Sequence, residues 1–274
     1  MIFQRLIWSA LAAAVLVGSV QTGVQRWQAA PLILSAEVYE DQKAETPAPS
    51  EALAAHTHAE ALAPEHEHGA DTEWAPENGL ERTAWTWVAN MLHAFSMALL
   101  VFAVMGVYLY KRGAALASLP LAAWVAAAGW LSFHFWPSLG LHAEVPGMDA
   151  APLHARQVWW VLAVGSASLA CAVLGFARAP WRWALAAVLL AVPFVVGAPH
   201  LQGDALAGFG PEAHAALEQL GKQFIWATHW VALSFWVCMG VACGLAFQRW
   251  LRPALLAAFE QGKPMANTPA GVNP

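Results

Sequence analysis

Six apolar runs, each long enough to cross a bilayer and free of charge at its centre, constrain this chain more than any other feature. A membrane-spanning helix needs about 20 mostly apolar residues. In lipid, a run of that length satisfies its backbone polar groups only as a helix. We therefore expect an all-α membrane protein, a bundle of about six transmembrane helices. The runs are Phe3–Val24, Ala84–Tyr110, Leu116–Leu139, Val158–Ala177, Trp181–Ala198 and Phe224–Phe247.

The composition argues against a water-soluble domain. Of the 274 residues, 59% are hydrophobic and 11% are charged, whereas an average soluble domain has about 45–50% and about 25%. The three cysteines, Cys171, Cys238 and Cys243, lie inside apolar runs without a CxxC pair. This placement predicts small core residues rather than a disulfide framework or a zinc ribbon.

The charges predict an orientation with both termini in the cytoplasm. In that orientation seventeen of the eighteen acidic residues fall outside, and only Glu260 falls inside. Eight of the thirteen basic residues then lie on short inner segments, as the positive-inside rule requires. The acidic outer face would attract cations rather than nucleic acid. The eight inner basic residues are Arg5, Lys111, Arg112, Arg178, Arg182, Arg249, Arg252 and Lys263.

The chain divides into four segments: a first transmembrane helix (1–27), a periplasmic His- and acid-rich segment (28–82), a five-helix bundle (83–250) and a cytoplasmic tail (251–274). Arg26 and Trp27, a typical interfacial pair, favour a retained first helix over a cleaved secretory signal. The stretch between Lys43 and Asp71 has little apolar periodicity, so it is expected to be flexible. Its flanks are expected to be more ordered.

The eleven histidines are the most informative polar residues. None of them falls in a predicted cytoplasmic segment. Imidazole binds late first-row divalent metals, and neighbouring carboxylates add charge and oxygen ligands. The flexible segment carries two His-x-His pairs that predict a metal-collecting tract, although a merely solvated loop is the alternative. These four residues are His56, His58, His66 and His68.

Three more histidines lie within the predicted spans, each nearer the outer end. Ionisable groups there usually face the bundle or a water-filled path. His93 shares a helical face with Asn90 and Met97, which favours a role in a pathway. His134 and His229 stand among aromatic residues, so a place in the interfacial aromatic belt is as well supported for them as a pathway.

The fifth run ends in a pattern that predicts a helix stop beside a histidine. Pro193 removes a helical donor, and Gly197 and Pro199 then end the helix just before His200. The carbonyl end of a helix carries partial negative charge, so it can attract a cation, as broken helices do in transporters. An ordinary helix terminus is the alternative.

No P-loop, HExxH, GxSxG or dinucleotide fingerprint occurs in the sequence, so we expect a protein that is not an enzyme. Energy for any transport would come from a gradient or from another protein.

Four motifs resemble one known family. They are PLILSAEVYE (Pro31–Glu40), WAPENGLERT (Trp74–Thr83), LGLHAEVPGMDAAPLHARQVWW (Leu139–Trp160) and GAPH (Gly197–His200). In this order they are similar to the CbtA family, a predicted cobalt transporter subunit. The resemblance implies an inner-membrane subunit that supplies cobalt for cobalamin synthesis, beside a small one-span partner with a His-rich end. The residues carried over from the motifs are Glu37, Glu81, Arg82, Glu144, Arg156 and His200.

We therefore predict a subunit that captures a divalent cation at the periplasmic face and passes it inward. Co²⁺ is the expected ion, and Ni²⁺ and Zn²⁺ fit the same ligand types. Two alternatives remain: a haem-binding electron carrier that uses two of His93, His134 and His229, and a metal-buffering scaffold or sensor that does not transport. The predicted metal ligands are His200, His142, Glu144, Glu37, His93, His229, His56, His58, His66 and His68.

Overall fold

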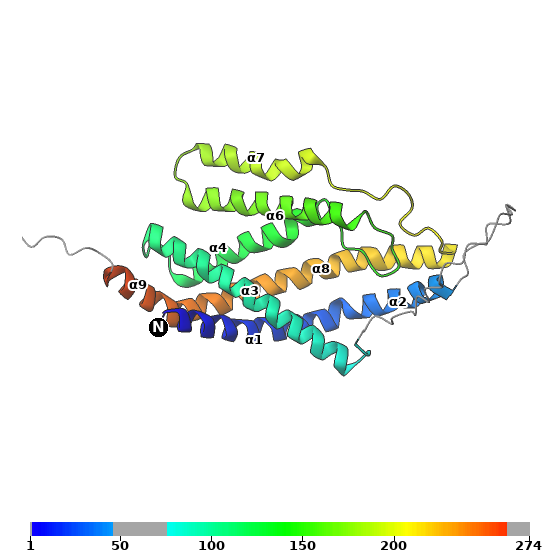
Figure 1. Ribbon diagram of the computed structural model, residues 1–274, viewed down its shortest axis with the longest axis horizontal. Coiled ribbons are helices and arrows are strands. Elements are labelled where there is room, and N and C mark those ends of the chain that lie inside the picture. Colours follow the sequence, from blue (N-terminus) through cyan, green and yellow to red (C-terminus); the bar gives the residue numbers. More distant parts are fainter. Residues whose placement is uncertain (1, 46–75, 262–274) are drawn as a thin grey trace, which may run out of the picture.

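The chain is all-helical over residues 2–45 and 76–261, the ranges that the computed structural model describes (Figure 1). No strand occurs within these ranges, which confirms the expected fold class. The elements are α1 (Ile2–Gln28), α2 (Ala30–Glu45), α3 (Leu80–Arg112), α4 (Ser118–Trp130), the π-helix η1 (Leu131–Phe135), α5 (Trp136–Ser138), α6 (Leu153–Phe176), α7 (Trp181–Val196), α8 (Pro211–Ala246), the π-helix η2 (Phe247–Leu251) and α9 (Arg252–Gln261).

Successive long helices run back and forth along the bundle (Figure 1). Five helical stretches are long and apolar enough to cross a membrane: Ile2–Gln28, Leu80–Arg112, Ser118–Ser138, Leu153–Phe176 and Pro211–Gln261. The remaining predicted run corresponds to α7, which has only 16 residues and is not among these five; it is about 24 Å long at the usual helical rise. It is shorter than the predicted run because Gly197 adopts a left-handed φ of 86° and ends the helix.

The N-terminus and α9 lie at the same end of the bundle (Figure 1). Arg5 Nη1 donates a hydrogen bond to the carbonyl oxygen of Trp250, at 3.4 Å. Arg112 and Arg182 donate hydrogen bonds to carbonyl groups where α6 ends. Basic side chains thus gather at this terminal end. We call the opposite end, where the segments 139–152 and 197–210 connect helices, the loop end.

The core lies where α1 packs on α3 and α4 packs on α8. Many of its buried residues are alanines, and small side chains let membrane helices approach closely. Helix α7 packs mainly on α6, at one edge of the bundle (Figure 1). The most deeply buried of these alanines are Ala10, Ala14, Ala94, Ala98 and Ala122.

A second, smaller core joins the segments of the loop end. Ala36 of α2 and Leu217 of α8 are fully buried there, with Val145 and Leu206 from the two connecting segments. Helix α8 begins at Pro211 rather than at the predicted Phe224. Its first turns therefore belong to this second core and not to an irregular loop. The motif 31–40, expected to be ordered, lies within α2.

Candidate metal site

A cavity of about 900 Å³ at the loop end brings together three of the predicted ligands. His142, Glu144 and His200 all line it, although 58 positions separate the two histidines in the sequence. The first turns of α6 and the start of α8 complete its wall. We call this space the loop-end cavity.

Two of the carboxylates that line the loop-end cavity, Glu144 and Glu218, are paired with cations. Arg156 Nη1 lies 2.6 Å from Glu144 Oε2, and Lys222 Nζ lies 2.6 Å from Glu218 Oε1. Each side chain of the Glu144–Arg156 pair is about one-third exposed. A carboxylate held in this way has a fixed direction, with a second oxygen free of this contact. The cavity therefore offers both imidazole and carboxylate groups.

The segment that leads to His214 carries a further acid–imidazole contact. Asp204 Oδ2 lies 3.2 Å from His214 Nε2, and Asp204 Oδ1 accepts a hydrogen bond from the backbone N–H of Leu206. The Leu206 N–H, and secondarily His214, holds the pKa of Asp204 below its usual value. This carboxylate thus orders the connecting segment.

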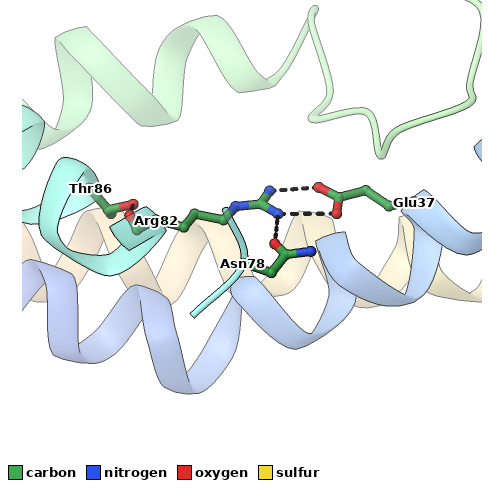
Figure 2. A network of polar contacts seen from close by, with 4 residues as sticks. All are labelled: Glu37, Asn78, Arg82 and Thr86. Carbon is green, nitrogen blue, oxygen red and sulfur yellow. Dashed lines mark hydrogen bonds and ion pairs between the residues drawn. The ribbon is translucent and has the colours of Figure 1, made fainter. Parts of the chain in front are cut away.

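Glu37, another predicted ligand, forms an ion pair with Arg82 outside the loop-end cavity. Figure 2 shows its carboxylate facing Arg82, with Nη2 at 2.6 Å from Oε1 and Nη1 at 3.1 Å from Oε2. Arg82 also donates to Asn78 Oδ1, at 2.8 Å. The pair joins α2 to the start of α3, and Glu37 lines neither of the two cavities described here. The motif residues Glu37, Arg82, Glu144 and Arg156 thus form two ion pairs.

A second cavity, of about 740 Å³, extends between the helices from Arg82 to His93 and Met97. His134 also lines it, so two of the three histidines in the spans face the same space. We call it the interhelical cavity. None of its lining residues is acidic among the part of the chain that the structure describes.

The interhelical cavity only partly matches the predicted polar face of α3. His93 and Met97 line it as expected. Asn90 instead donates hydrogen bonds to Thr22 Oγ1 at 3.0 Å and to Gln25 Oε1 at 2.7 Å. This amide ties α3 to α1 and does not face the cavity.

His134 and His229 form a direct pair that the sequence did not reveal. His134 Nε2 lies 3.3 Å from His229 Nδ1, and the ring planes meet at 85°. The sequence supports a place in the aromatic belt and a pathway role equally for His134, and the predicted ligand set does not include it. Its proximity to Pro137 and its place among aromatic residues gave no sign of a partner 95 positions away. The two axial ligands of a haem iron lie on opposite sides of the metal, an arrangement that nitrogens 3.3 Å apart do not have.

Two tryptophans bind carbonyl groups in the last two turns of α7. The indole N–H of Trp136 donates to the carbonyl of Leu190 at 3.1 Å, and that of Trp159 donates to the carbonyl of Pro193 at 2.9 Å. These hydrogen bonds join α7 to α5 and α6 next to the point where the chain turns toward His200. His200 is exposed and faces the loop-end cavity.

Within residues 2–45 and 76–261, no three His, Cys, Asp or Glu side chains lie close enough together to hold a metal ion. The four histidines of the predicted collecting tract lie outside the described residues. The side chains that share the loop-end cavity thus line it without forming a closed cluster of three such ligands.

The fold and its cavities define a multi-pass helical membrane protein with imidazole groups at its loop end and in its interior. The chain belongs to the family described as the probable cobalt transporter subunit, CbtA, whose model matches residues 3–248. Membership of this family implies that the protein works with cobalt ions and with other subunits of a transport system. No curated protein and no solved structure shows a significant match to the chain.

Proposed function

We propose that this subunit captures a divalent cation, Co²⁺ first, in the loop-end cavity and passes it inward through the interhelical cavity. The observation that carries the proposal is the convergence of His142, Glu144 and His200 on one cavity. Imidazole and carboxylate together suit late first-row divalent ions, so Ni²⁺ and Zn²⁺ would compete. Glu37 is omitted from this ligand set because Arg82 holds both of its oxygens.

The proposed orientation places the loop end in the periplasm and both termini in the cytoplasm of a bacterium. The basic side chains at the terminal end support it, since Lys and Arg favour the cytoplasmic side of the inner membrane. In this orientation a captured ion moves from the loop end toward His93 and His229. The His-x-His pairs of the periplasmic segment would raise the local metal concentration.

The cavities share one lining residue, Trp160 of α6. We place the transfer from the capture site to the interior at this residue. A small one-span partner with a His-rich end is the proposed second subunit, and a gradient or that partner would supply the energy.

The test is Co²⁺ uptake by vesicles that contain the chain, alone and with a one-span partner. His200→Ala should abolish uptake at every Co²⁺ concentration, while the protein still inserts at the wild-type level. His154→Ala is the matched control, because His154 is exposed near the start of α6 and lines neither cavity. Normal uptake by His200→Ala would place capture elsewhere. Metal binding without uptake in any preparation would favour a buffering scaffold.

A further inference from the structure

Two histidines of the described bundle, His134 and His229, are in direct contact. They come from η1 and α8, and their facing nitrogens, Nε2 and Nδ1, are 3.3 Å apart. The side chains are half-buried, and the rings meet edge-on rather than stacking. Two helices would not bring two imidazoles together inside a membrane bundle without a compensating interaction, because each ring is costly to remove from water.

The separation of the two nitrogens fits a shared metal ion. An imidazole nitrogen lies about 2.0–2.1 Å from a bound divalent ion such as zinc, so two nitrogens at the tetrahedral angle are about 3.3–3.4 Å apart. The same separation also allows an N–H···N hydrogen bond when no ion is bound, with one ring donating and the other accepting. We propose that His134 Nε2 and His229 Nδ1 together bind one late first-row divalent cation, with Co²⁺ as the ion of interest.

The surroundings supply the remaining requirements of such a site. His134 lines the interhelical cavity, as does Thr228 beside His229, so water can complete the coordination shell. Gln21 lines the same cavity, is only 7% exposed and leaves its Oε1 without a hydrogen-bond partner. An amide oxygen that faces the cavity can accept a hydrogen bond from water inside it.

The ligand set also explains why an ion would stay only briefly. Each imidazole binds a metal only through a nitrogen that carries no proton, so the ligands themselves bring no negative charge. No acidic residue of the described chain lines this cavity either. The double positive charge therefore remains uncompensated in a half-buried place, which weakens binding. Weak binding suits a site on a path. The assignment of this site to a transport path rests on the proposed function. Metal binding by the two histidines can be tested without measuring transport.

The local backbone places His134 where it can reach α8. The π-helical turn η1 interrupts the α-helical run before Pro137 and carries His134 in its fourth position. Such turns are rare and are often found at functional sites. The turn is followed by Trp136, whose indole is held by the carbonyl of Leu190, so this end of the helix is anchored on the side of α7 as well.

The experiment uses the full-length chain in which His56, His58, His66 and His68 are replaced by alanine, purified in lipid nanodiscs and titrated with Co²⁺. Tetrahedral nitrogen-bound Co²⁺ is followed by its visible absorption. His134→Phe and His229→Phe should each weaken this binding more than about tenfold, because a direct ligand should matter at least as much as an outer-shell partner. The double variant should lose no more than either single one, because the two residues act as a unit. His154→Ala is the control.

A gain of signal separates the site from a folding defect. His229→Cys keeps a ligand at this position and should add a thiolate-to-cobalt charge-transfer band that disappears when His134→Phe is combined with it. Helical content measured by circular dichroism should be the same in all variants. Unchanged titrations in both single variants, or a cysteine variant without the new band, would overturn the proposal.

The capture-site variant His200→Ala distinguishes this inference from the proposed function. It should keep the absorption that depends on His134 and His229 while uptake is lost. Absorption that depends on the pair, in a protein that never transports, would leave the site standing and refute transport. Uptake that is normal in His134→Phe and His229→Phe, without any absorption that depends on the pair, would refute the site alone.

Discussion

Arg82 binds both carboxylate oxygens of Glu37 and thereby joins α2 to the start of α3 (Figure 2). The two side chains are 34% and 29% exposed, so water screens the pair in part. Glu37→Gln should therefore lower the free energy of unfolding by only about 1 kcal/mol. Thermal unfolding of the purified protein measures the loss.

The exchange of the two charges is the control for this prediction. Combining Glu37→Arg with Arg82→Glu should restore most of the lost stability, because the pair is re-formed in reverse. Co²⁺ affinity should be unchanged in Glu37→Gln. A large loss of affinity would show instead that Glu37 is a metal ligand.

Gly140 should be needed for the closure of the loop end against α6. A Cβ atom at this position would lie 2.3 Å from the indole of Trp159 and 3.1 Å from Cβ of Ala198. Gly140→Ala should thus cost about 1–3 kcal/mol of stability through overpacking. Gly165→Ala in α6 is the matched control, since nothing lies within 4 Å of its added Cβ. Equal melting temperatures for the two variants would contradict the close packing.

Trp160 should limit the passage of ions between the two cavities. It is the one residue of the described chain that lines both of them. Trp160→Ala should raise the rate of Co²⁺ uptake and leave the affinity of the loop-end cavity unchanged. Trp160→Phe, which keeps an aromatic barrier, should behave nearly as the wild type. An uptake rate that does not change in Trp160→Ala would show that the transfer occurs elsewhere.

The collecting tract should matter only when metal is scarce. Deletion of 52–69 removes all four of its histidines and none of the residues that line the cavities. Uptake should fall at low Co²⁺ and remain normal at saturating Co²⁺. A complete loss at both concentrations would assign the tract a direct role in passage.

Metal capture by this tract should weaken in acid. An imidazole has an ordinary pKa of about 6.5, and its protonated form cannot bind a metal. A peptide that covers residues 51–71 should therefore bind Co²⁺ more weakly at pH 5.5 than at pH 7.5. Calorimetric titration at the two values checks this. Equal affinities would remove histidine from the account of the tract.

The sequence predicted the all-helical membrane fold because the requirement behind it is local. Each apolar run must satisfy its own backbone polar groups in lipid, whatever its neighbours are. The stop of α7 before Gly197 was also predicted from local residues, because Gly197 and Pro199 do not continue a helix. The early start of α8 at Pro211 was not, since its first turns are amphipathic and are ordered by packing against Ala36 and Val145.

The motifs also marked the residues that meet at the loop end, but not how they meet. Glu37, Arg82, Glu144 and Arg156 were all singled out, and only the packed structure joins them into two ion pairs. A carboxylate beside a metal and a carboxylate beside an arginine look alike in a sequence.

The sequence by itself determined the class of protein and the family to which it belongs. The tertiary structure alone decided that His134 meets His229 and that His142 shares a cavity with His200. Helical periodicity reports which side chains share a face of one helix. The meeting of two faces depends on how helices far apart in the chain pack, because side-chain size and the crossing of whole helices set those contacts.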